Sequence, residues 1–176
     1  MSSSSNRDYQ EARLQDLNSS TESALGQLFK QVCHSQRWAD EMVRSAPFQD
    51  LEDLLAKGAR AWSECEEKDW MEALDGHPRI GQKASGSSLS AKWSAGEQAA
   101  AKSPDQQVLD ELAEAQQNYF EKFGFIFLIC ASGRSSHEIL AAAKERLNHS
   151  RSEEIQKVAD EQAKIIHLRL EKLLTS

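Results

Sequence analysis

The sequence predicts an all-α protein, folded as a single domain of about eight helices. Glycine and proline are scarce, at 8 and 3 of 176 residues, and alternating β-branched runs that would indicate strands are almost absent. Apolar residues instead recur with the 3.6-residue period of amphipathic helices. A chain of this length suits one domain with a sizeable core. We expect a polar N-terminal lead-in over residues 1–20 and one helical domain over residues 21–176.

Individual helices are expected where the apolar period is clear. Leu25, Leu28, Phe29 and Val32 share one buried face, and Thr21 can begin their helix. Further helices are expected at about residues 38–43, 50–64, 67–75, 95–102, 105–122, 136–148 and 152–174, with a short apolar turn near 126–131. The period is lost between residues 75 and 93, where a long loop of functional or disordered character is expected.

Charge and composition exclude several classes of function. Lys plus Arg number 21 and Asp plus Glu number 28, a net charge of −7 that argues against binding nucleic acid. No apolar run approaches the roughly 20 residues of a membrane span, and the N-terminus does not read as a signal peptide. The three cysteines lack CxxC spacing and the histidines lack paired metal-ligand spacing, so neither a disulfide framework nor a metal site is expected. These features favour a cytoplasmic protein.

His77 is the first candidate for chemistry. Pro78 fixes the backbone after it, and Gly76 and Gly81 allow tight turns on either side. The result would be an imidazole on a rigid loop, and an imidazole titrates near neutral pH, as general acid or base work requires. The alternative is a loop histidine that caps the preceding helix.

Two further candidates lie at Ser94–Gln98 and at Arg169. Ser94 and Glu97 fit the Ser-x-x-Glu capping box, which predicts the start of a helix, whereas Gly96 suggests close approach of a ligand to the helix N-terminus. Arg169 falls on the apolar stripe of the last predicted helix, where a guanidinium needs a partner. That partner is either a substrate, or an internal Glu or the solvent edge.

Several motifs in series make the chain resemble the family of OHCU decarboxylases, which act on 2-oxo-4-hydroxy-4-carboxy-5-ureidoimidazoline. The resemblance covers roughly residues 20–174. The motifs, in order, are Gly76-His77-Pro78-Arg79-Ile80-Gly81, Ser94-x-x-Glu97-Gln98, Asn118-Tyr119, Lys122-Phe123-Gly124-Phe125, Phe127-Leu128-Ile129-Cys130-Ala131, Glu145-Arg146-Leu147-Asn148 and Lys164-Ile165-Ile166-His167-Leu168-Arg169-Leu170. Ile126 stands where many members have Pro.

The resemblance implies a cofactor-free, all-helical enzyme, commonly a homodimer, that forms (S)-allantoin in urate breakdown. It assigns catalysis to His77, Glu97 and Arg169. It assigns substrate contacts to Pro78, Ser94, Gln98 and the backbone of residues 127–131, with Phe127, Ile129 and Ala131 as the contacting positions. It implies no metal. The competing reading is a non-enzymatic helical binding module, and a third reading keeps the chemistry on a related ureido acid.

Overall fold

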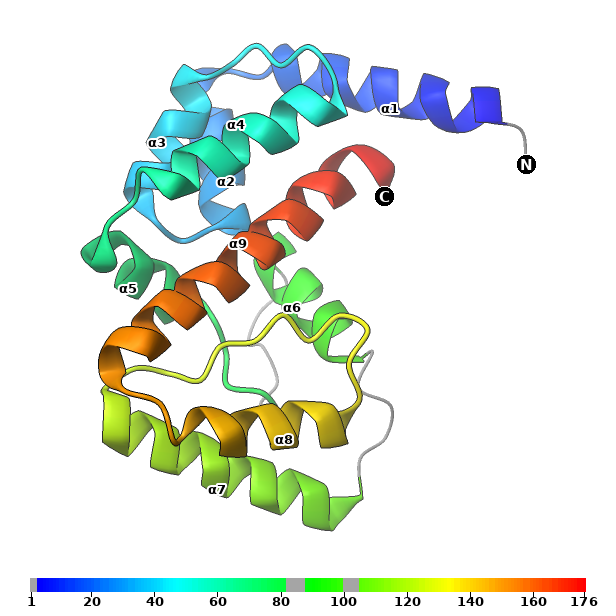
Figure 1. Cartoon of the computed structure of the whole chain (residues 1–176). Coiled ribbons are helices and arrows are strands. Elements are labelled where there is room, and N and C mark those ends of the chain that lie inside the picture. Colours follow the sequence, from blue (N-terminus) through cyan, green and yellow to red (C-terminus); the bar gives the residue numbers. More distant parts are fainter. Residues whose placement is uncertain (1–2, 82–87, 100–104) are drawn as a thin grey trace. The chain divides into compact units, whose positions relative to one another are not determined.

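A computed structural model describes residues 3–81, 88–99 and 105–176 of the chain (Figure 1). Within these ranges the chain forms nine helices and no strand, so the all-α prediction is confirmed. The chain divides into two compact units. Unit 1 comprises residues 1–73 and 163–176, and unit 2 comprises residues 74–162. The single domain over residues 21–176 stays a prediction.

Unit 1 is built from the N-terminal helices and the end of the last helix. Its helices are α1 (Ser3–Asn18), α2 (Glu22–Val32), α3 (Gln36–Arg44), α4 (Leu51–Ser63), most of α5 (Glu67–Asp75) and the C-terminal part of α9 (Arg151–Thr175). Thr21, Ser35 and Asp50 each accept a backbone N–H at the start of α2, α3 and α4, which is the usual N-cap bond. The core of unit 1 includes Phe29, Val32, Trp38, Met42, Leu54, Ile166 and Leu170. The predicted helices of this region are therefore confirmed.

Helix α1 differs from the polar lead-in that the sequence predicts. Its residues are mostly exposed, and only Leu17 enters the core, so no apolar period marks it. Long-range hydrogen bonds hold it, among them two pairings with Phe48 through Asn18 and two with the end of the chain. The Tyr9 hydroxyl donates to the carbonyl of Ser176 at 2.8 Å, and Arg13 Nε donates to the carbonyl of Leu173 at 3.2 Å. Partners 30 to 167 residues away leave no local pattern in the sequence.

The variant Gly58→Ala is expected to lose about 1–3 kcal/mol of unfolding free energy, although alanine is the better helix former. The added Cβ would lie 2.4 Å from Cδ1 of Leu170, which is fully buried, so core side chains must shift. Urea denaturation followed by circular dichroism measures the change. Gly26→Ala is the control: its Cβ meets only Val43, at 3.9 Å, and it should gain about 0.5–1 kcal/mol. An equal gain at both glycines would contradict the tight contact.

Unit 2 contains α6 (Leu89–Ala99), α7 (Gln106–Phe123), α8 (Ser136–Arg146) and the N-terminal part of α9. Helix α7 ends at Gly124, whose φ of +81° is the left-handed conformation that glycine adopts without strain. Helix α8 begins with a capping box between Ser135 and Glu138. Helices α7 and α8 lie side by side (Figure 1). The core includes Val108, Leu112, Ala115, Tyr119, Phe123, Phe127, Ile139, Ala143 and Val158.

The described part of the chain contains no helix that is both long enough and apolar enough to cross a membrane. None of the three cysteines forms a disulfide. All three are buried, and burial raises the pKa of Cys33 to about 12 and that of Cys65 to about 11. Thiols of this kind stay protonated at neutral pH and pack as small apolar groups.

Candidate active site

Hydrogen bonds from α6 and α7 hold the described start of the loop that follows α5, residues 76–81. The amide side chain of Gln116, on α7, accepts from the N–H of Ile80 and donates to its C=O, both at 2.9 Å. Gln98 Oε1, on α6, accepts from the N–H of Gly81 at 3.1 Å. Gly81 has a φ of +86°, so the turn requires glycine. His77 and Pro78, both half-buried, lie just before this hydrogen-bonded turn, and the rigidity of their loop stays a prediction.

The His77 side chain is held by the last helix. Its Nε2 lies 2.7 Å from Oε1 of Gln162, which is 1% exposed on α9. The backbone N–H of His77 donates to the Leu74 carbonyl at 3.0 Å and so closes the end of α5. The helix end is thus capped by the backbone of His77, and the imidazole itself is directed to Gln162. This arrangement weakens the purely capping interpretation of the residue.

The prediction that Ser94 caps a helix beginning near residue 95 is wrong. Helix α6 begins at Leu89, and the N–H of Ala91 is accepted by Ser88 Oγ at 3.2 Å. The helix formers between Ser88 and Ser94 extend the helix by a turn and a half, which places Ser94 and Glu97 in its interior. Both are buried, at 5% and 9% exposure, one turn apart on the same side of α6. A capping box therefore does not explain these two polar residues.

Gln98 lies at the wall of a small cavity in unit 2. The cavity has a volume of about 180 Å³ and is lined by Ile80, Gly81, Gln98, Leu109, Leu112, Ser136 and Ile139. Gln98 Oε1 already accepts from Gly81, and the amide nitrogen is the donor that Gln98 can offer to a ligand. The wall of the cavity is thus mostly apolar, and Gln98 and Gly81 contribute polar groups to it.

The segment 127–131 is fastened through alternate residues. Arg146 Nη1 donates to the Leu128 carbonyl at 2.7 Å, and the N–H of Cys130 donates to Glu161 Oε2 at 2.8 Å. The Cys130 carbonyl accepts from Arg134 Nε at 3.2 Å. In contrast, the backbone groups of Phe127 and Ile129 bond to none of the described residues, although both residues are buried. Buried backbone groups are almost always paired, so these two positions suit a ligand.

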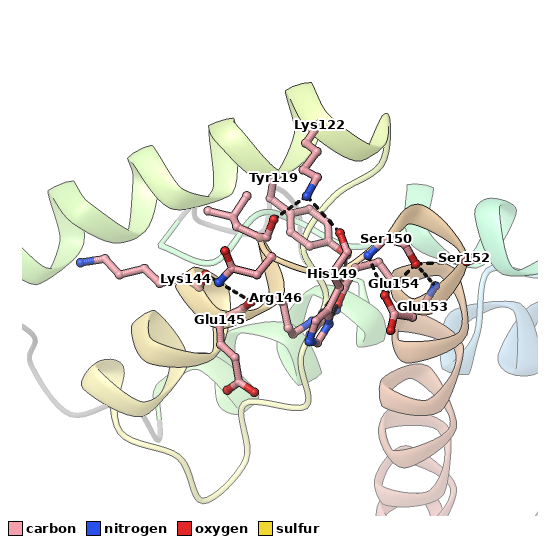
Figure 2. A network of polar contacts seen from close by, with 12 residues as sticks. Tyr119, Lys122, Lys144, Glu145, Arg146, His149, Ser150, Ser152, Glu153 and Glu154 are labelled. Atoms are coloured by element: carbon pink, nitrogen blue, oxygen red, sulfur yellow. Dashed lines mark hydrogen bonds and ion pairs between the residues drawn. The ribbon is translucent and has the colours of Figure 1, made fainter.

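A buried ionic network supports this segment (Figure 2). Arg146 and Glu154, 4% and 0% exposed, form an ion pair in which Nη2 and Oε2 are 2.8 Å apart. The Tyr119 hydroxyl also donates to Glu154, and His149 Nδ1 lies 2.7 Å from Glu154 Oε1. The guanidinium lies 4.6 Å from the ring centre of Phe127. Arg146 thus contacts the Glu154 carboxylate on α9 and, within segment 127–131, the ring of Phe127 and the carbonyl of Leu128.

Burial and the polar contacts of this network shift the pKa values of Glu154 and Tyr119 in opposite directions. Burial alone would raise the pKa of Glu154, but hydrogen bonds from Arg146 and Tyr119 and the positive charge of Arg146 outweigh it, so the pKa is lowered. The pKa of Tyr119 is raised, first by burial and then by its bond to Glu154. At neutral pH Glu154 is therefore a carboxylate and Tyr119 a neutral phenol.

Arg169 belongs to unit 1 and is 1% exposed. Its Nη1 donates to the carbonyl of Val32, the last residue of α2, at 3.1 Å. From the sequence, the expected partner was a substrate, an internal Glu or the solvent edge, and a helix-terminal carbonyl was not among these alternatives. Burial, followed by the nearby charge of Arg169, lowers the pKa of His34. The structure therefore describes Arg169 within unit 1 and the other candidates within unit 2.

Sequence reasoning missed three supporting residues of unit 2, namely Glu154, Glu161 and Gln116, and gave no role to Arg146. A signal was present for the two glutamates, because both fall on the apolar stripe of α9 with Val158 and Gln162. Charges on a buried stripe need partners, and the partners here are Arg146 and the backbone of Cys130. Among the residues that the structure describes, no group of three metal-ligating side chains is found.

Comparison with known proteins identifies relatives over most of the chain. The sequence profile of the OHCU decarboxylase family matches residues 18–171. The uric acid degradation bifunctional protein TTL of Arabidopsis thaliana is 39% identical over 150 residues, covering 84% of this chain and 46% of that protein, so the chain spans about half of that relative. A 2-oxo-4-hydroxy-4-carboxy-5-ureidoimidazoline decarboxylase of Haloferax volcanii is 27% identical over 175 residues, 94% of this chain and 98% of that protein.

Solved structures show the same fold. A crystal structure of an OHCU decarboxylase in the presence of (S)-allantoin superposes with a TM-score of 0.74 at 35% identity, covering 84% of this chain and 97% of that one. A crystal structure of an (S)-allantoin synthase has a TM-score of 0.68 at 19% identity and covers 91% of this chain and 53% of the other. The second likeness shows the fold alone.

Proposed function

The chain belongs to the OHCU decarboxylase family, and we propose that it converts 2-oxo-4-hydroxy-4-carboxy-5-ureidoimidazoline to (S)-allantoin in urate breakdown, without a cofactor and with protonation on one face. The family match over residues 18–171 carries the proposal. The half-buried His77 on a fixed loop supports it from the side of chemistry, because a proton donor in a set position is what this reaction needs.

The reaction breaks the bond between the ring carbon and its carboxylate. CO₂ leaves, the electron pair remains in the conjugated ring, and one proton is taken up, which yields allantoin. Because the ring itself delocalises the pair, the protein has to orient the carboxylate, stabilise the charge that develops, and deliver the proton to one face. His77 is the proposed acid. Glu97, buried on α6, is proposed to orient His77 or to hold the ureido N–H groups.

The remaining contacts are proposed for polar groups of unit 2. Ser94, Pro78 and the Gln98 amide nitrogen would meet the ring and ureido edges of the substrate. The backbone groups of Phe127 and Ile129, which bond to none of the described residues, would bind the same polar edges together with Ala131. The Ala131 carbonyl already accepts from the N–H of Arg134 at 3.0 Å, so its N–H is the group left for a substrate. We further propose a homodimer located in the cytoplasm.

Arg169→Ala is expected to lose activity mainly in kcat. An arginine paired to the departing carboxylate would stabilise the ground state, so the proposed contact is a ring oxygen that gains charge. Steady-state kinetics separate kcat from KM, and a loss confined to KM would point to uniform substrate binding. Because the buried guanidinium also bonds Val32, circular dichroism and Arg169→Lys, which keeps the charge, control for misfolding.

The test of the function is turnover of fresh substrate. The substrate is generated in situ from urate and mixed with the protein while circular dichroism follows the appearance of chiral allantoin. Rapid formation of one enantiomer supports the proposal. If only the slow racemic background is seen, the proposal is refuted and the binding-module reading takes its place. A panel of related ureido acids, run in the same assay, decides between the proposed substrate and the third reading.

A further inference from the structure

The amide of Gln162 occupies a position where a polar side chain needs a reason. Gln162 lies on α9 among apolar residues of the buried stripe, and it is 1% exposed. An amide buried without partners costs about 1–3 kcal/mol, so each of its groups is expected to be paired. Its oxygen meets this expectation, because Oε1 lies 2.7 Å from His77 Nε2.

The nitrogen of the Gln162 amide does not meet the expectation that buried polar groups are paired. Gln162 Nε2 is buried and has no hydrogen-bond partner among the described residues. The buried amide of Gln116, in contrast, is paired through both groups: its oxygen accepts from the N–H of Ile80 and its nitrogen donates to the C=O of Ile80. The unpaired donor of Gln162 therefore lies directly beside the proposed proton donor, His77, on a side chain that is held in place by its other end.

We propose that Gln162 both positions His77 and binds the substrate, an inference that rests on the proposed function. Its Oε1 accepts the Nε2–H of the imidazole, and its Nε2 donates to an oxygen of the anionic ureido-imidazoline. Because an amide oxygen can only accept, the neutral His77 ring carries its proton on Nε2. The proton that His77 exchanges with substrate is then bound at Nδ1. One amide thus fixes the tautomer of the acid and the place of the substrate oxygen.

Two substitutions separate the two roles. Gln162→Glu keeps an oxygen for the His77 Nε2–H but removes the donor and adds a negative charge. KM should rise about 10- to 100-fold, and the limb of the pH–rate profile that reports His77 should move to higher pH, because an adjacent carboxylate favours the imidazolium. Gln162→Leu removes both groups, so kcat should fall and KM should rise. A residue that only fills space in the core would change stability but not the pH profile.

Gln156→Glu is the matched control. Gln156 is exposed on the same helix and bonds Asp160, so this variant adds the same charge to α9 without touching His77. Its KM, kcat and pH profile should match those of the wild type. If Gln162→Leu has the wild-type KM and kcat, the substrate contact is refuted. A shift of the pH profile in Gln156→Glu equal to that in Gln162→Glu would refute the direct effect on His77.

The tautomer can be read without turnover. Nitrogen-15 NMR of the protein with labelled histidine, assigned with His77→Asn, should show the Nε2–H form of His77 in the wild type and a mixed or altered form in Gln162→Leu. A dominant Nδ1–H form in the wild type overturns the positioning role. An inactive wild type refutes the proposed function, and with it the substrate contact of Gln162, whereas the NMR result still decides the positioning role.

Discussion

Arg146→Met should cost about 3–5 kcal/mol of unfolding free energy, a large share of the stability of a domain. The substitution keeps most of the side-chain volume but leaves Glu154, 0% exposed, without its guanidinium partner, and leaves the Leu128 carbonyl without its donor. The Tyr119 hydroxyl and His149 still contact the buried carboxylate, but neither replaces the charge of the guanidinium. Urea denaturation measures the change, and catalysis should fall with it because segment 127–131 loses an anchor.

Lys144→Met is the control on the same helix. Lys144 pairs with Glu111 at 2.5 Å, but both side chains are exposed, so the change should stay within about 1 kcal/mol. The double variant Arg146→Met/Glu154→Leu should recover much of the loss, because an apolar pair needs no compensation. If Arg146→Met and Lys144→Met cost the same, the ion pair does not stabilise the fold.

The pH dependence of the same variant follows from Glu154. In the wild type its pKa is lowered, so its contribution to stability is complete above the ordinary pKa of a glutamate and is lost as the pH falls through the folded-state value. Without Arg146, burial is expected to raise the pKa of Glu154 instead. The stability difference between wild type and Arg146→Met should therefore shrink as the pH is lowered, because protonation removes the uncompensated charge.

His77→Asn should lower kcat about 10²- to 10⁴-fold, the usual contribution of a positioned general acid. The fold should persist, because the loop stays fixed by the bonds of Gln116 to Ile80 and of Gln98 to Gly81, neither of which involves the imidazole. Single-enantiomer formation followed by circular dichroism measures the loss, and urea denaturation measures the stability.

His137→Asn is the matched control for this prediction. His137 is exposed on α8, and its loss should leave kcat unchanged. Turnover of His77→Asn near that of His137→Asn would remove His77 from the reaction. A drop in both variants would instead indicate an effect of histidine content or folding unrelated to the proposed acid.

The helices could be predicted because amphipathic helices carry their evidence locally. The faces of α2, α4 and α9 follow the helical period, and Thr21 caps α2 where that helix was expected to begin. Helix α6 shows the limit of local evidence: Ser94 and Glu97 fit a helix start, yet the helix begins five residues earlier. A capping motif cannot be distinguished by sequence from two buried polar residues one turn apart.

The sequence indicates candidate site residues only where distinctive neighbours, such as proline and glycine, mark them. His77 is marked by the neighbouring Pro78 and Gly81, whereas Glu154 and Glu161 are ordinary glutamates until their partners are known. Those partners are 8 and 31 residues away, namely Arg146 and the N–H of Cys130. Such long-range pairings are set by tertiary packing, so single-chain patterns do not contain them.

The anchoring of segment 127–131 through Leu128 and Cys130 has a consequence for how ligand recognition by this segment can be tested. The groups left for a ligand at Phe127 and Ile129 are main-chain atoms, which every amino acid except proline supplies in full. An alanine scan there would report the packing of the two buried side chains and not the recognition by their backbone groups. Replacing single amides by esters, which deletes one N–H at a time, is the perturbation to which such a surface responds.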